Sequence, residues 1–290
     1  MSLETHFEEL KTKGYTVIPN VLNNQEVEEA KAMFYNWQKT IMNHDNFHNN
    51  YNSHGIYKYH EVGHQEHAWF IRTRPSVINI FKKLWNTDDL IVSFDGSCYI
   101  PKICNKKNKS WTHTDQSPLK KGVHCYQGLV SLTENKERTL IVYEQSHLIH
   151  EHYFMLIGQE NEKKDWQLID PEFLGEIAEY KRVLHVPAGA LVLWDSRTFH
   201  ENQYGNPNSE ERIVQYLCYL PKNVETNTKK MQEKRLKYFE EKRTTSHWPS
   251  PICVNGLQPH TYGNKEHQID YSLLKQPNLE KYKETIMQLI

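Results

Sequence analysis

Three side chains of types that bind metal ions stand in or directly after β-rich runs of the sequence. His113 and Asp115 are separated by one residue in the segment Trp-Thr-His-Thr-Asp. Because alternate side chains of a strand point to the same face, both can reach one metal ion. His200 ends a second segment, in which a Pro-Ala-Gly turn and an apolar strand come first, and it can supply a third ligand. Two histidines and one carboxylate leave open positions on the metal, which suits iron(II) that must bind a co-substrate and dioxygen.

Arg212 lies twelve positions after His200, at the start of another β-rich run. Its planar guanidinium can bind a carboxylate through two parallel hydrogen bonds, so we interpret it as the group that holds the distal carboxylate of a 2-oxo diacid. A salt bridge at the rim with Glu210 or Glu211 is the alternative, and the metal-ligand pattern upstream favours the binding role. Zinc fits the same three ligands, but a zinc hydrolase has no evident need for this arginine.

The elements that must position these residues are mainly β. Six runs rich in Val, Ile, Leu and Tyr predict strands at residues 90–100, 123–132, 139–143, 183–186, 190–194 and 213–220. So many strands separated by polar or turn residues argue for an antiparallel sandwich or barrel.

Helices are expected on both sides of this β region. Apolar spacing and capping residues predict helices at residues 7–14, 23–41, 75–85, 148–158, 171–180 and 279–289, a short strand at 15–18, and a solvated surface helix in the lysine-rich run 228–243. Residues 43–67 are polar and without periodicity, which predicts a long irregular loop that covers the site.

Composition limits the class of protein. The 290 residues are 38% hydrophobic and 24% charged, as expected for one large domain. The formal net charge of -1 gives no sign of a surface that grips nucleic acid. Five scattered cysteines without a Cys-x-x-Cys spacing predict reduced thiols. The first residues do not resemble a signal peptide, and no stretch approaches the ~20 apolar residues of a membrane span, so we expect a cytoplasmic protein.

Together these segments resemble the phytanoyl-CoA dioxygenase family of iron(II)- and 2-oxoglutarate-dependent oxygenases over most of residues 7–220. Residues 7–18 look like the opening of that family, His113-Thr-Asp115 like its first metal motif, and residues 187–212 like its closing metal and co-substrate segment. The resemblance implies a mainly β fold with flanking helices around a double-stranded β-helix core of the jelly-roll, cupin-like type.

The resemblance also implies a chemistry and a role for each residue. His113, Asp115 and His200 would bind Fe(II), and Arg212 would pair with the C5 carboxylate of 2-oxoglutarate. The family couples O2 and 2-oxoglutarate to substrate hydroxylation and releases succinate and CO2, with ascorbate as the reductant that supports turnover in vitro. Asp115 favours hydroxylation, because relatives that halogenate lack this carboxylate.

Gln127 and Asn202 are further candidates for binding the co-substrate. Gln127 lies on the strand after the first motif, where relatives often place a polar contact to 2-oxoglutarate. Asn202 follows His200 by two residues, where relatives often carry a hydroxyl side chain. A strand residue facing solvent and a turn former are the alternatives for these two positions. Tyr99 is a weaker candidate, since a buried core tyrosine is the commoner case.

The expected mouth of the pocket departs from the family. Residues 144–147 read Glu-Gln-Ser-His where relatives commonly show Pro-Gly-Ser-His, and residues 134–138 replace a glycine-rich step. No basic cluster stands out as a site for the phosphates of coenzyme A. We therefore expect a small-molecule substrate or a modified side chain, and we do not infer an acyl-CoA.

Residues 1–221 are predicted to form the oxygenase core with N-terminal helical elements. Residues 222–290, which include Thr-Thr-Ser-His-Trp-Pro-Ser-Pro at 244–251, are predicted to form a helical extension packed on the same domain. Two other functions stay open: a metal-binding module of this fold without catalysis, which the intact ligand set disfavours, and a cupin-type zinc enzyme, which would tolerate loss of Arg212. Neither a membrane nor a nucleic-acid partner is expected, and the sequence makes no prediction of oligomeric state.

Overall fold

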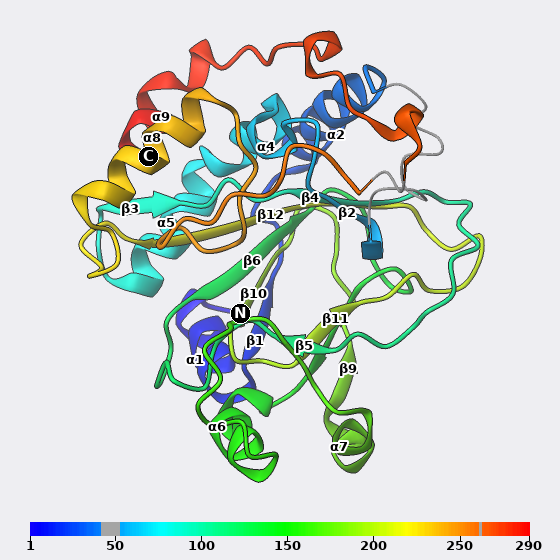
Figure 1. Ribbon diagram of the computed structural model, residues 1–290, viewed down its shortest axis with the longest axis vertical. Helices are drawn as coiled ribbons and strands as arrows, with labels where there is room; N and C mark the ends of the chain where they lie inside the picture. Colours follow the sequence, from blue (N-terminus) through cyan, green and yellow to red (C-terminus); the bar gives the residue numbers. More distant parts are fainter. Residues whose placement is uncertain (42–52, 261–262) are drawn as a thin grey trace.

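Two antiparallel β-sheets form the centre of the computed structural model, which describes residues 1–41, 53–260 and 263–290 (Figure 1). The larger sheet contains β1 (Tyr15–Ile18), β2 (Ile56–Tyr57), β3 (Leu90–Val92), β4 (Ser97–Ile100), β6 (Tyr126–Ser131), β10 (Leu191–Asp195) and β12 (Arg212–Pro221). The smaller sheet contains β5 (His113–Thr114), β7 (Leu140–Tyr143), β8 (Gln167–Leu168), β9 (Lys181–Val183) and β11 (His200–Asn202). The strand orders are β1-β10-β6-β12-β4-β2, with β3 also paired to β12, and β8-β5-β11-β7-β9.

Helices cover the outer side of the larger sheet and the far end of the smaller one (Figure 1). They are α1 (Leu3–Lys13), α2 (Asn24–Gln38), α4 (Glu66–Arg72), α5 (Pro75–Trp85), α6 (Ser146–Leu156), α7 (Pro171–Glu176), α8 (Lys229–Glu240) and α9 (Lys283–Leu289). Short 3-10 helices occur at Ser53–Gly55, Val62–His64, Ala178–Tyr180, Lys265–His267, Tyr271–Leu273 and Glu280–Tyr282. Within these described ranges no helix is long and apolar enough to cross a membrane. Asn23 and Glu26 form the predicted capping box of α2.

Both faces of the larger sheet are buried, against different partners. On β12, Ile213, Leu217 and Tyr219 belong to the core beneath the helices, whereas Val214 belongs to the core between the two sheets. Tyr216 packs against that second core. Because side chains alternate along a strand, the even-numbered residues of β12 point into the space between the sheets.

The C-terminal segment is held on the outer side of the larger sheet. The side chain of Arg235 in α8 is buried, and it donates hydrogen bonds to the backbone oxygens of Val92, at 2.8 Å, and of Pro249. Ile286 and Leu289 of α9 join the main apolar core. The prediction that residues 228–243 form a solvated surface helix is therefore wrong at Arg235, since helical spacing brings one of its cations inward.

Two predicted elements differ in the structure. Of the predicted irregular loop, residues 43–52 lie outside the described residues, whereas residues 53–67 form β2, two 3-10 helices and the start of α4. The predicted strand 90–100 is interrupted between β3 and β4. At the interruption Gly96 packs closely against β2, and a Cβ at this position would collide with the backbone oxygen of Tyr57.

Buried histidines should make the fold sensitive to acid. Burial lowers the pKa of His64 and His67 to about 3 and that of His60 and His150 to about 4. Between pH 4 and pH 6.5 the unfolded chain binds protons at these side chains that the folded chain does not bind, so stability rises with pH in this window. Asp95 and Glu61 act oppositely, because burial raises the pKa of both carboxyl groups, that of Asp95 to about 6, but they are two groups against four.

We therefore expect the free energy of unfolding to be largest above pH 6.5 and to fall as the pH is lowered toward 4. Urea unfolding at constant ionic strength measures this dependence, and His67→Gln should give a shallower slope because it removes one of these groups. Stability that is constant or rises on acidification would contradict the expectation.

Candidate metal centre

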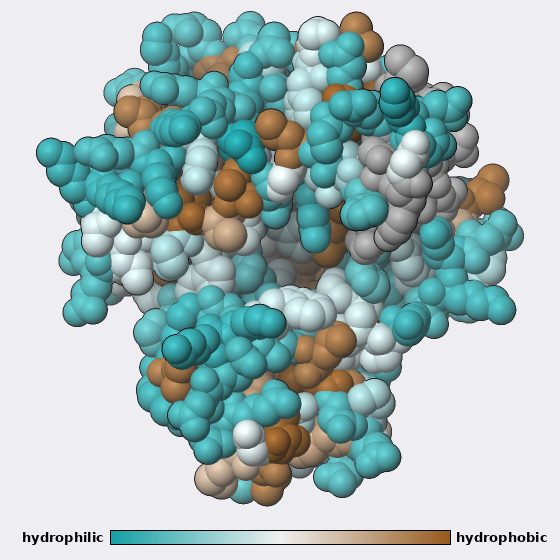
Figure 2. Space-filling view, in the orientation of Figure 1, coloured by the Kyte–Doolittle hydropathy of each residue, from teal (hydrophilic) through white to brown (hydrophobic). Residues whose placement is uncertain are grey.

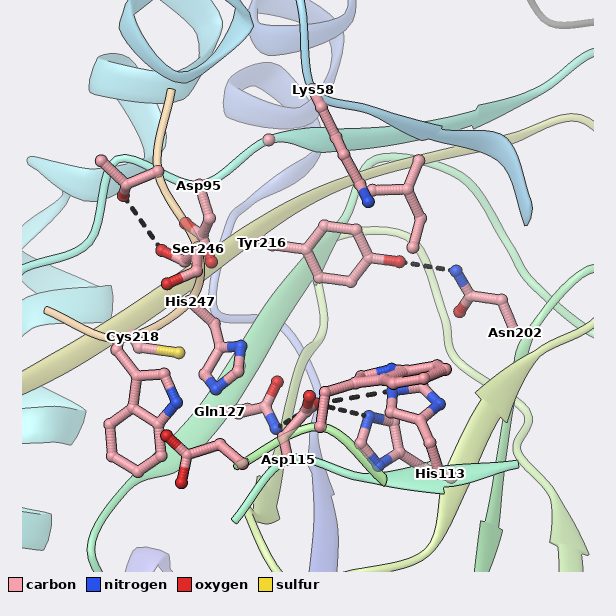
Figure 3. A pocket seen from close by; sticks show the side chains of 18 of the residues that line it. Lys58, Asp95, His113, Asp115, Gln127, Asn202, Tyr216, Cys218, Ser246 and His247 are labelled. Carbon is pink, nitrogen blue, oxygen red and sulfur yellow. Dashed lines mark hydrogen bonds and ion pairs between the residues drawn. The ribbon is translucent and has the colours of Figure 1, made fainter. Parts of the chain in front are cut away.

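His113, Asp115 and His200 converge between the two sheets (Figure 3). β5 pairs with β11 so that His113 and His200 stand directly opposite each other. Asp115 Oδ2 lies 3.5 Å from His113 Nε2 and 3.3 Å from His200 Nε2. Donor atoms about 2.1 Å from one first-row metal ion, at right angles, lie about 3 Å apart. The three side chains that the sequence singled out are thus spaced so that they can hold a metal ion.

Backbone carbonyl groups orient both imidazole rings. His113 Nδ1 donates to the oxygen of Trp111 at 3.1 Å, and His200 Nδ1 donates to the oxygen of Thr198 at 2.8 Å. These bonds leave the Nε2 lone pairs facing Asp115, which is the tautomer a metal ligand needs. Burial, and next the charge of His113, lower the pKa of His200, so this ring is neutral at pH 7.

The carboxyl group of Asp115 is held in its ionised form. Burial alone would raise its pKa, but the neighbouring His247, His113 and His200 rings keep the pKa well below its usual range. Gln127 Nε2 also donates to Asp115 Oδ2, at 2.9 Å. Gln127 therefore contacts a cluster residue in this structure, where the sequence predicted a contact to the co-substrate.

A cavity of about 420 Å³ opens in front of the cluster. The face of the molecule seen in Figure 2 is hollowed near its centre. Four tryptophans give the cavity much of its apolar wall: Trp111, Trp166, Trp194 and Trp248. Its polar lining includes Lys58, Asn202, Tyr216, Ser246, His247 and Asn255. The candidate metal centre thus faces a space large enough for a small organic molecule.

Arg212 lies at the start of β12 with its side chain 1% exposed. Its Nε and Nη1 atoms have no hydrogen-bond partner among the described residues. Arg212 is not among the described residues that line the cavity, but Tyr216, on the same face of β12, is. Burial raises the pKa of Tyr216, and the charge of Arg212 opposes that rise, which places the two groups close together. A buried guanidinium with unused donors is suited to a carboxylate.

Asn202 also lines the cavity, whereas Tyr99 does not. Asn202 Nδ2 donates to the hydroxyl oxygen of Tyr216 at 2.6 Å, and the buried Oδ1 has no partner within the described chain. Tyr99 packs in the core beneath the helices, with its ring centroid 5.7 Å from that of Phe34. The structure therefore brings Asn202 to the site and removes Tyr99 from it.

Sequence reasoning missed several lining residues. Lys58 follows β2 and extends into the cavity toward Tyr216 (Figure 3). The Trp111 ring stacks on that of His113, with centroids 4.6 Å apart. His247 reaches the cavity from the C-terminal segment. Two features of the sequence could have pointed to these residues: the tryptophan inside the metal motif and the His-Trp pair at 247–248. None of the three residues has an obvious structural reason to be there.

Comparisons with known proteins add an independent line of information. A model of the family described as phytanoyl-CoA dioxygenase matches residues 10–207. Ava biosynthesis cluster protein O of Aspergillus versicolor is 30% identical to this chain over 204 residues, which are 66% of this chain and 65% of that protein. The chain thus spans about 65% of the length of this relative.

Two solved structures are similar in fold. One is the epimerase SnoN in complex with Fe3+, alpha ketoglutarate and nogalamycin RO, with a TM-score of 0.51, 18% identity, and coverage of 76% of this chain and 83% of that chain. The other is EctD from S. alaskensis with 2-oxoglutarate and 5-hydroxyectoine, with a TM-score of 0.53, 15% identity, and coverage of 96% of this chain and 88% of that chain. These likenesses confirm the predicted fold class.

Proposed function

The chain belongs to the phytanoyl-CoA dioxygenase family, and on that premise we propose that it is an iron(II)- and 2-oxoglutarate-dependent dioxygenase that hydroxylates a small molecule. One observation carries the proposal: two histidines and one carboxylate converge at a cavity, and a buried arginine with unused donors lies near the same cavity. The cluster of two histidines and one carboxylate suits the metal, and the arginine suits the co-substrate.

In this proposal His113, Asp115 and His200 hold the iron. Two neutral imidazoles and one carboxylate would leave a bound Fe(II) with a net positive charge and would leave it able to take further ligands. Gln127 fixes the orientation of the Asp115 carboxylate through its hydrogen bond to Oδ2. Bound iron supplies the chemistry that converts O2 and 2-oxoglutarate to succinate and CO2 and hydroxylates the substrate carbon.

Arg212 would pair with the C5 carboxylate of 2-oxoglutarate, because its Nε and Nη1 donors are otherwise unused. The hydroxyl group of Tyr216 and the ammonium group of Lys58 are two further hydrogen-bond donors, and both line the cavity. Asn202 Nδ2 donates to the Tyr216 oxygen, so the Tyr216 hydroxyl proton points elsewhere, and it can turn from the weak acceptor Cys98 Sγ to a bound carboxylate. Together these groups would neutralise the charge of the diacid and fix its position beside the metal.

The alternative of a cupin-type zinc enzyme gives Arg212 no role. Arg212 is buried and has no salt bridge to the part of the chain that the structure describes. A hydrolase that needs only the three metal ligands would leave this cation unpaired, which is costly. The same buried cation disfavours a module that binds metal without the co-substrate. A bound diacid removes this cost, and this favours the oxygenase.

Succinate formation tests the proposed function. Protein purified without oxygen is given iron(II), ascorbate, 2-oxoglutarate and air, and we expect succinate that depends on added iron. His113→Ala should form none, because it removes a metal ligand. His185→Ala is the matched control, since His185 is exposed and hydrogen-bonds Glu134 on the surface. Absence of both succinate and 2-oxoglutarate binding in the unaltered protein would overturn the proposal.

A further inference from the structure

Residues 244–255, here called the strap, form one wall of the cavity. The strap follows α8 in the chain (Figure 1, orange). It contributes Thr245, Ser246, His247, Trp248, Cys253 and Asn255 to the cavity lining. The family match ends at residue 207, so this wall lies outside the matched part of the chain.

The core of the molecule holds the strap in place. Thr245 donates its backbone N–H to the oxygen of Phe94 at 2.9 Å, and Thr245 Oγ1 accepts the N–H of Phe94 at 3.1 Å. Thr244 Oγ1 accepts the N–H of Gly63 at 3.2 Å. An antiparallel bridge between Thr245 and Val254 closes the strap on itself. The side chains between these anchors are therefore presented to the cavity from a fixed backbone.

Three consecutive strap residues carry buried polar atoms without a partner. Ser246 Oγ, His247 Nε2 and Trp248 Nε1 make no hydrogen bond to the part of the chain that the structure describes. Buried polar groups in native proteins are almost always hydrogen-bonded. These three atoms stand on consecutive residues that line one cavity, so a molecule bound there could satisfy them.

His247 faces the candidate metal centre. Its ring projects from the strap toward Asp115 and Gln127 (Figure 3). It is not one of the three residues whose ligand atoms lie within 4.8 Å of one another. Its free Nε2 would therefore contact what lies in front of the metal, with no need for it to bind the metal itself.

The other walls and the charges limit what this molecule can be. Trp166 lies over the cluster, with its ring centroid 5.6 Å from that of His113, and the Trp194 centroid is 5.3 Å from that of His200. The Asp165 carboxylate near the mouth is paired with Lys120 at 2.6 Å. Lys58, the remaining cation of the lining, extends toward Tyr216 (Figure 3), where the proposed co-substrate would pair with it. The flat aromatic walls beside the strap therefore suit an uncharged ring system.

We propose that the strap is the substrate-recognition wall of this site and that His247 hydrogen-bonds an oxygen of an uncharged, ring-containing substrate. The indole N–H of Trp248 can only donate, so the substrate must offer an acceptor oxygen, such as a hydroxyl or carbonyl oxygen. Ser246 Oγ and His247 Nε2 can each donate or accept. This inference rests on the proposed function, because it names the substrate class of the same site.

Binding of two matched probes tests the inference. The probes are tetralin and 1-tetralol, which share one ring system and differ by a hydroxyl group. Calorimetric titration uses protein loaded with iron(II) and 2-oxoglutarate without oxygen, so that no turnover occurs. We expect 1-tetralol to bind about fivefold more tightly than tetralin, as one added hydrogen bond implies.

Variants of His247 test whether this residue causes the preference for 1-tetralol over tetralin. His247→Phe keeps a ring of similar shape without the hydrogen bond, so both probes should bind it with the affinity that tetralin shows for the unaltered protein. His247→Gln, which retains a polar group, should keep part of the preference. His247→Leu gives the same comparison if the Phe variant does not fold, and His152→Phe on the exposed surface of α6 is the control.

The outcomes separate this inference from the proposed function. Failure of the unaltered protein to bind iron or 2-oxoglutarate would contradict the proposed function itself. If both bind normally, the inference is overturned when neither probe binds, when the two probes bind equally, or when the preference persists in His247→Phe. It is also overturned if His247→Phe loses 2-oxoglutarate binding, because the strap would then act only as structural support.

Discussion

Replacing Asp115 with alanine should abolish iron-dependent succinate formation and weaken iron(II) binding by more than about 100-fold, since even residues behind metal ligands commonly change affinity 10- to 100-fold. The Asp115 side chain is buried between the two cluster histidines. Without it, two neutral imidazoles remain to hold a divalent cation. Metal titration followed by succinate measurement checks this expectation, with Asp88→Ala on the exposed surface as the control.

The effect of chloride on iron affinity gives a second test of the role of Asp115. Asp115→Gly removes the carboxylate and leaves room for a small anion beside the metal. We expect chloride to restore part of the iron affinity in this variant and to have no such effect in the unaltered protein. Unchanged iron affinity in either variant would show that Asp115 is not a ligand.

Arg212→Leu should raise the apparent KM for 2-oxoglutarate by about 30-fold or more and leave iron(II) binding unchanged. Truncating one member of a buried charge pair typically costs at least about 2 kcal/mol of binding free energy, and the Arg212 donors have no other partner among the described residues. Arg212→Lys should recover only part of the affinity, because an ammonium group cannot form two parallel hydrogen bonds.

Thermal unfolding of the same variant distinguishes a binding role from a structural one. A ligand that binds only the folded state raises the melting temperature, so 2-oxoglutarate should raise it in the unaltered protein and have no effect in Arg212→Leu. Without 2-oxoglutarate, the variant should be no less stable, because it loses a buried charge that has no salt bridge to the described residues. An equal loss of iron affinity in the Arg212 and Asp115 variants would contradict the division of roles.

The cluster could be predicted because its geometry follows from local rules. Alternation along a strand puts His113 and Asp115 on one face, and the turn and apolar strand before His200 deliver that residue to a strand end. The capping box of Asn23 and Glu26 likewise marks the start of α2 through two neighbouring side chains. Such features depend on residues within a few positions of one another, so the sequence pattern reveals them.

The rest of the site depends on contacts between distant segments. Lys58 and His247 are 189 positions apart and meet at the same cavity, and no local pattern signals that encounter. The contact between Gln127 and Asp115 arises because β6 and the end of β5 face each other across the two sheets. The burial of Arg235 escaped prediction for the same reason, since its partners Val92 and Pro249 lie on other segments.

The shortness of β5 has a consequence for the iron-free protein. β5 contains only His113 and Thr114, and its neighbours β8 and β11 contain two and three residues. So few ladder hydrogen bonds leave this edge of the smaller sheet with little cohesion of its own. An ion bridging His113 and His200 would tie β5 to β11, so part of the free energy of metal binding would appear as local order. Release of the ion would therefore loosen this corner first, while the larger sheet, with its two buried faces, stays intact.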